Sequence, residues 1–340
     1  MATSARPRLP ARHRARAAAI APAAVLALAA GSLAGGAAWA QAWPRKPVTL
    51  IVPFPPGAAT DVFGRVAARR MSELLGQQIV VINRDGASGT IGTDLVAKAA
   101  PDGYTLLWGS SGPLAISPVW TEKLPYEPLR DLQPISLFAK IPFLLLVHPS
   151  VPARSVKELV ALARARPGVL NFASSGTGGT AHLAAEMFLS MAGVQMTHVP
   201  YKGTSLFATE LLAGQVDLAF AGPTTGLPHL KTQRLRALAT TGTERSDLVP
   251  ELPTMAEAGV PGYDFTQWYG LLAPARTPRE IVVALNATLL KAMDDPEVQR
   301  RILQEGGRAA PTSPEAFAAL IRTELEKNAQ LIRRLNLKRE

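Results

Sequence analysis

The chain of 340 residues is 47% hydrophobic, carries a formal net charge of +10 and contains no cysteine. Without cysteine, neither a disulfide nor a lipoprotein-type anchor can form. The basic residues are scattered and lack the interleaved aromatic side chains typical of a nucleic-acid channel. The histidines are isolated, with no HxxxH or HExxH spacing. Composition therefore predicts no metal site, no cofactor and no nucleic-acid partner.

The first 40 residues have the features of a secretory signal peptide. Five arginines precede an Ala/Leu/Val-rich stretch, and Ala38-Trp39-Ala40 fits a small-x-small cleavage site. The alternative is a permanent membrane anchor, but proline and glycine interrupt the stretch, which is shorter than the roughly 20 apolar residues a spanning helix needs. We expect cleavage after residue 40 and export to the periplasm. Cleavage would lower the formal charge from +10 to +5.

From residue 48 onward, short β-branched runs alternate with amphipathic helical stretches. Strands are predicted at residues 48–52, 78–82, 104–108, 143–147, 170–173, 197–199, 216–220, 235–239 and 270–273. Helices are predicted from near residue 60 and at 91–99, 156–164, 181–191, 206–212, 278–293, 297–304 and 314–335. Such alternation predicts an α/β fold with parallel sheets flanked by helices.

Two segments are candidate linkers between domains. Residues 138–142 are one, and residues 241–261, which are polar and rich in proline and glycine, are the other. The roughly 300 residues after the leader exceed what a single core usually supports. We therefore expect residues 41–140 and 241–340 to form lobe one, residues 141–240 to form lobe two, and a ligand to lie between them.

Two strand-to-helix loops have the composition of an anion site. The first loop is PFPPGAATD at residues 53–61, and the second loop is ASSGTGGTA at residues 173–181. Each would present backbone N–H groups at a helix N-terminus, where unsatisfied donors and the helix dipole attract anions. The alternative for the first loop is purely structural, with Gly57 permitting a turn and Asp61 capping the helix.

The second loop also fits a nucleotide-binding motif. Gly176, Gly178 and Ala181 match the loose fingerprint GxGxx(G/A). After the next predicted strand, however, the chain has Pro200 and Tyr201 where an acidic ribose ligand would be expected. An exported protein would also lack access to cytoplasmic NAD, so dinucleotide binding is disfavoured.

A secreted serine hydrolase is another alternative. Ser110-Ser111 and Ser174-Ser175 end predicted strands, and His182 is close in sequence to the second pair. No serine of the mature chain stands in a GxSxG nucleophile elbow, and one nearby histidine is a weak signal for a catalytic triad. We expect His182 to point along its helix into a lobe or a cleft wall.

Several further segments carry a family resemblance. They include Trp43-Pro44, the first loop, residues 86–92, PDGYTL at 101–106, LPY at 124–126, residues 171–176, HVPYKG at 198–203, GQV at 214–216, EAG at 257–259 and residues 270–274. Together they resemble the Bug proteins, the substrate-binding proteins of tripartite tricarboxylate transporters, over essentially the whole mature chain. The resemblance implies a two-lobed type II periplasmic binding protein, or Venus flytrap, in which each lobe is a mostly parallel sheet flanked by helices.

The resemblance also implies a ligand site without catalytic residues or metal. Lobe one would contribute Phe54, Pro55, Gly57, Ala58, Ala59, Thr60, Asp61, Ser110 and Ser111. Lobe two would contribute Ser174, Ser175, Gly176, Thr177, Gly178, Thr180, His182, Tyr201, Lys202 and Gly203. Where the family usually has a second glycine, this chain has Ala58, whose methyl group would be costly at a positive φ.

We therefore expect a monomeric periplasmic protein that captures a small carboxylate-bearing molecule between its lobes and closes on it. The ligand would be a dicarboxylate or tricarboxylate, an amino acid or an aromatic acid. Its partners would be the membrane components of a tripartite tricarboxylate-type transporter. The alternative within the binding class is a periplasmic sensor that reports to a sensor kinase of a two-component system.

Overall fold

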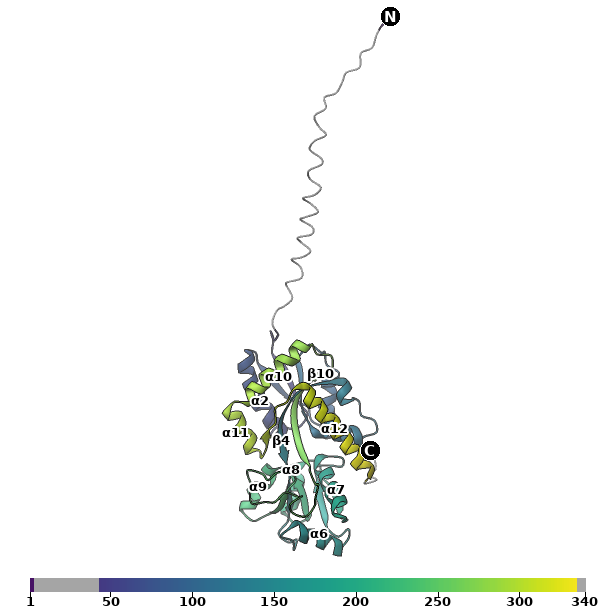
Figure 1. Cartoon of the computed structure of the whole chain (residues 1–340), viewed down its shortest axis with the longest axis vertical. Helices are drawn as coiled ribbons and strands as arrows, with labels where there is room; N and C mark the ends of the chain where they lie inside the picture. The colour runs from purple at the N-terminus through teal and green to yellow at the C-terminus, as the bar shows by residue number, and fades with distance from the viewer. Residues whose placement is uncertain (3–42, 335–340) are drawn as a thin grey trace. The chain divides into compact units, whose positions relative to one another are not determined.

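The computed structural model describes residues 1–2 and 43–334. Apart from its first two residues, the predicted signal peptide lies outside the described residues, so export by this leader stays a prediction. Within the described part of the chain, no helix is both long and apolar enough to cross a membrane. Lys46–Glu340 is one compact unit, which contains the helices and strands described below (Figure 1).

One sheet has six strands in the order β11-β4-β10-β3-β1-β2. They are β1 (Val48–Val52), β2 (Ile79–Asn83), β3 (Thr105–Ser110), β4 (Leu132–Pro142), β10 (Thr266–Pro274) and β11 (Arg308–Ala309). β1 pairs in parallel with β2 and β3, whereas β10 is antiparallel to β3 and β4. Because β1 and β3 are parallel, the first loop and the end of β3 lie at the same edge of the sheet.

Helices cover this sheet and fix the first loop. They are α2 (Ala59–Leu75), α3 (Thr90–Ala97), α10 (Arg279–Met293), α11 (Pro296–Gln304) and α12 (Pro314–Arg334), with the short turns η1 (Ala87–Gly89), η2 (Gly112–Ile116), α4 (Ser117–Trp120) and α5 (Pro128–Asp131). α2 buries Phe63, Ala67 and Met71, which share one helical face. The Phe63 ring lies 5.5 Å from that of Phe138 and 5.2 Å from that of Tyr269. Burying one such ring contributes about 2 kcal/mol.

The other sheet has five strands in the order β7-β6-β8-β5-β9. They are β5 (Leu144–Val147), β6 (Asn171–Ser174), β7 (Thr197–Pro200), β8 (Leu218–Ala221) and β9 (Arg236–Thr240). Its helices, grouped around it in Figure 1, are α6 (Val156–Ala165), α7 (Thr180–Ala192), α8 (Thr204–Leu212) and α9 (Pro223–Lys231). β6 pairs in parallel with β7 and β8, and β5 is antiparallel to β8 and β9. Both sheets are thus mixed, with antiparallel strands beside the predicted parallel ones.

The chain passes between the sheets twice, and one threonine joins the two passages. β4 leads directly into β5, and the segment after β9 returns to β10. The Thr241 hydroxyl accepts the Phe143 N–H at 2.7 Å and donates to the Phe265 carbonyl at 2.6 Å. Thr241 is fully buried. The two crossings are therefore held together rather than independent.

The candidate linker at residues 138–142 is the last part of β4, which leads into β5 of the other sheet. Phe138 and Ile141 are buried, and the segment pairs with β10. Pro134 and Pro142 of β4 are register partners of β10, and both lie outside the short pairing with β11 at Lys140 and Ala139. α9 was not predicted because Pro223, Gly226 and Pro228 obscure its helical pattern.

Candidate functional site

The first loop is held by a carboxylate. Gly57 has φ +84°, and its N–H donates to the Asp61 carboxylate at 3.0 Å. The same carboxylate forms an ion pair with Arg65 at 2.9 Å and accepts a hydrogen bond from Asn83 at 2.8 Å. Burial raises the pKa of Asp61, but the bonds from Arg65, Gly57 and Asn83 outweigh this and lower it overall. Asp61 therefore supports the loop as an ionised group.

Ala58 imposes no backbone strain on the first loop. It is the N-cap of α2, with φ −67° and ψ 155°, an extended conformation that alanine adopts freely. The positive φ of the loop falls on Gly57 instead. The methyl group thus leaves the loop backbone unaffected, and any influence on a ligand must be steric.

Buried hydroxyls gather where β3 ends beside the first loop. Ser110 and Ser111 are 1% and 4% exposed, and neither side-chain oxygen has a hydrogen-bond partner within the described residues. Ser110 is paired across the sheet with Tyr269, whose hydroxyl bonds Gln267 and Thr60. Burial raises the pKa of Tyr269, so this phenol stays neutral. Because an unpartnered buried hydroxyl costs free energy, both serines are candidates for ligand contacts.

A series of contacts connects the two loops. The Phe54 ring packs against Gly89, 3.0 Å from the position that a Cβ on this glycine would take. The carbonyl of the neighbouring Ser88 approaches Gly112, 4.0 Å from the position that a Cβ would take there. The Thr180 methyl, at the start of α7, lies 3.9 Å from that point on Gly112. Gly112, just after the end of β3, is therefore next to the N-terminus of α7.

The second loop is held by two histidines and a tryptophan. Gly178 donates its N–H to His182 Nδ1 at 3.1 Å, and Ser174 Oγ lies 2.7 Å from His198 Nε2. A Cβ on Gly178 would lie 2.7 Å from the Trp120 ring. His182 is 5% exposed, which agrees with the expected wall position. Among the described residues, its polar contacts are to Gly178 and Glu186, not to a serine.

Most of the remaining predicted residues belong to this loop or follow β7. Ser175, Thr177, Tyr201 and Gly203 are half-buried and Lys202 is exposed, as is Pro55 of the first loop. The Tyr201 N–H donates to the Ser174 carbonyl at 3.0 Å, and burial raises the pKa of its phenol. Sequence reasoning missed Trp120, His198 and Tyr269 as site residues. Only His198 carried a signal, since it opens the segment HVPYKG.

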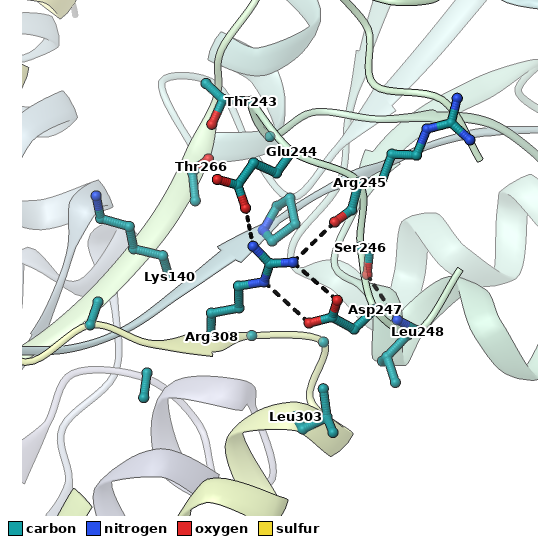
Figure 2. A pocket seen from close by; sticks show the side chains of 16 residues that line it. Lys140, Thr243, Glu244, Arg245, Ser246, Asp247, Leu248, Thr266, Leu303 and Arg308 are labelled. Carbon is teal, nitrogen blue, oxygen red and sulfur yellow. Dashed lines mark hydrogen bonds and ion pairs between the residues drawn. The ribbon is translucent and has the colours of Figure 1, made fainter. Parts of the chain in front are cut away.

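A separate cavity of about 260 Å³ lies at the crossing between the sheets, and its lining includes none of the predicted ligand residues. Figure 2 shows Arg308 at its centre, bonded to Glu244, Asp247 and the Arg245 carbonyl. The three partners of Arg308 lie in the segment after β9, whereas Arg308 itself belongs to β11. Among the described residues, no group of histidine or acidic side chains is arranged to hold a metal ion.

Sequence comparison gives clear relatives. Residues 63–337 match the family described as "Tripartite tricarboxylate transporter family receptor". The chain is 42% identical to a UPF0065 protein from the tcbD-tcbE intergenic region of Pseudomonas sp. strain P51, covering 86% of this chain and 87% of that one. It is 38% identical to the protein BugT of Bordetella pertussis, covering 88% and 92%.

Solved structures show the same fold. Rpa4515 from R. palustris, solved with adipate, superposes with a TM-score of 0.81 at 36% identity, covering 87% of this chain and 99% of that one. MatC from Rhodopseudomonas palustris, with bound malate, gives 0.77 at 32% identity, covering 85% and 100%. The two-lobed periplasmic binding protein fold is thereby confirmed. The chain belongs to the tripartite tricarboxylate transporter receptor family, whose members are periplasmic solute-binding proteins and not enzymes.

Proposed function

We propose that this protein binds a small dicarboxylate between the first and second loops and delivers it to the membrane components of a tripartite tricarboxylate-type transporter. The observation that carries the proposal is the pair of buried, unpartnered hydroxyls of Ser110 and Ser111. Gly112, the residue after Ser111, lies beside Thr180 at the N-terminus of α7. A carboxylate there would accept bonds from the serines and from backbone N–H groups, with the dipole of this 13-residue helix favouring its charge.

The charges around the loops support an anionic ligand. The only carboxylate of the first loop, Asp61, is neutralised by Arg65, and the second loop contains no acidic residue. Lys202 is exposed two residues before α8 and adds a positive charge beside the second loop. The two related proteins described above were solved with adipate and malate, which are both dicarboxylates.

The arrangement of the sheets supports the proposed lobe boundaries. We assign residues 41–140 and 241–340 to lobe one and residues 141–240 to lobe two, after removal of residues 1–40 as a signal peptide. The strands of the six-stranded sheet fall almost wholly in the first set, and those of the five-stranded sheet fall in the second. Export would bring the protein to the periplasm, the compartment in which a receptor of this family would meet its ligand.

Calorimetric titration of the mature protein with adipate and malate tests the proposal. We expect binding of at least one of them, and none of adipamide, which has the length of adipate without its charges. Ser110→Ala and Ser111→Ala should each weaken binding about tenfold or more, since a hydrogen bond to a charged group contributes about 1.5–3 kcal/mol. Ser190→Ala, in the last turn of α7, is the matched control. Absence of binding by any dicarboxylate, or equal binding by all three serine variants, would refute the proposal.

A further inference from the structure

Two imidazole rings are stacked beneath the second loop. His182, in the first turn of α7, and His198, in β7, have ring centroids 3.9 Å apart and an interplanar angle of 8°. Phe172 stacks on His198 at 4.8 Å, and the Trp120 ring meets His182 at 5.2 Å with its edge. His182 is buried and His198 is half-buried, so aromatic side chains cover much of the pair.

Each imidazole holds a different end of the loop. The backbone N–H of Gly178 can only donate, so His182 Nδ1, which accepts it, carries no proton. The ring proton of His182 then belongs on Nε2, which lies 3.5 Å from the Glu186 carboxylate. At the other end, His198 Nε2 bonds Ser174 Oγ, which also accepts the Gly176 N–H at 3.2 Å.

We propose that His182 and His198 form a neutral imidazole pair that positions the second loop for its ligand, and that protonation of the pair releases the loop and weakens binding. This inference rests on the proposed function, because the second loop is one half of that site. A proton added to His182 would occupy Nδ1, the atom that Gly178 uses. Two imidazolium charges 3.9 Å apart would repel each other strongly.

The groups around the pair are compatible with this neutral state. Glu186 on α7 is the one carboxylate with a contact to it among the described residues, while β6 and α4 present Phe172 and Trp120. Burial, together with the charge of His182, lowers the pKa of His198 to about 4 from a usual value of 6.5. Between these two values the unfolded chain binds more protons than the folded one, so stability falls as the pH falls through that window.

The test compares variants that keep or remove the acceptor atoms. His182→Asn retains an acceptor near Nδ1, His198→Gln retains a polar group near Nε2, and neither titrates. His182→Leu removes the acceptor, and His229→Gln, on α9, is the control. At pH 7.5 we expect the Asn and Gln variants to bind adipate within about threefold of wild type, and the Leu variant about tenfold more weakly. Between pH 7.5 and 4, where His198 of the folded protein begins to take up its proton, wild type should lose more affinity than the His182→Asn/His198→Gln double variant. Protonation of adipate affects both proteins equally.

A measurement without ligand separates this inference from the proposed function. NMR of protein labelled with ¹⁵N-histidine should show His182 neutral at pH 7.5, with the proton on Nε2. A charged His182, or the opposite tautomer, would overturn the inference, and so would equal binding and equal pH profiles for wild type and His182→Leu. If the NMR result is as expected but no dicarboxylate binds, the imidazole pair stands as the support of the loop and the proposed function fails.

Discussion

The first and second loops do the same geometric task with different chemistry. Each follows a strand, opens a helix and contains a glycine with positive φ, Gly57 in one and Gly178 in the other. The first loop is tied down by an ionised carboxylate, Asp61, and the second by a neutral pair of histidines. Two helix N-termini that look alike in sequence can therefore respond differently to acid.

The expected order of that response follows from the pKa directions. The pKa of Asp61 is lowered in the folded protein, so its contribution to stability is present above its usual value and is lost only as the pH falls through the lowered one. The pKa of His198 is lowered from 6.5 to about 4. Keeping this histidine neutral therefore begins to cost free energy once the pH falls below about 6.5, which is above the range in which Asp61 titrates. On acidification, the second loop should loosen before the first.

The largest difference between the loops is expected for alanine substitutions at their glycines. At Gly57 there is open space for a Cβ, so Gly57→Ala should lower the free energy of unfolding by about 1 kcal/mol from φ strain alone. At Gly178 the Cβ would also meet Trp120 at 2.7 Å, so Gly178→Ala should cost about 3 kcal/mol. Urea unfolding of both variants measures this. Equal losses would mean that Trp120 does not constrain the second loop.

A smaller loss is expected when the carboxylate support of the first loop is removed. Asp61 is 3% exposed and its loss leaves Gly57 and Asn83 without an acceptor, so Asp61→Ala should lower the free energy of unfolding by about 2 kcal/mol at pH 7. Arg65 is half-exposed and can be hydrated. The difference from wild type should shrink as the pH falls through the lowered pKa of Asp61. Asp61→Asn, which keeps the shape without the charge, should lose less; an equal loss would show that the charge, not the shape of the side chain, holds the loop.

The smallest effect is expected at the exposed ion pairs outside both loops. Arg308 is half-exposed, and its partners Asp247 and Glu244 are more exposed still. Exposed ion pairs of this kind contribute about 0.2–1 kcal/mol to the free energy of unfolding. Arg308→Ala should thus cost less than about 1 kcal/mol in urea unfolding, and less still in high salt. Arg69→Ala, which removes an exposed pair with Glu297 within one lobe, is the control. A loss at Arg308 as large as that at Asp61 would mean that the crossing, rather than the loops, dominates stability.

Sequence periodicity was sufficient for most of the fold. The predicted strand at residues 48–52 coincides with β1, and the helix predicted at 181–191 differs from α7 by one residue at each end. The pattern failed at β4 and α9, because prolines inside both elements look like breaks. Strand direction was also inaccessible, because antiparallel pairing of β10 depends on the return of the chain from the other sheet.

The candidate site was predictable only in part. Ser110 and Ser111 were expected as ligand contacts from the family resemblance, but their burial and lack of partners depend on the packed structure. His198 lies 16 residues and Trp120 lies 62 residues from His182 in the chain, so no local pattern indicates that these rings meet. Tertiary packing, not local propensity, decides which residues support each loop.

The most direct test of the account is a crystal structure of this protein with adipate. We predict one carboxylate of adipate within about 3 Å of the Ser110 or Ser111 hydroxyl, and contact of the ligand with the second loop near Thr180. Adipate bound instead in the cavity beside Arg308, or held by one loop while both serine hydroxyls stay unpartnered, would contradict the account.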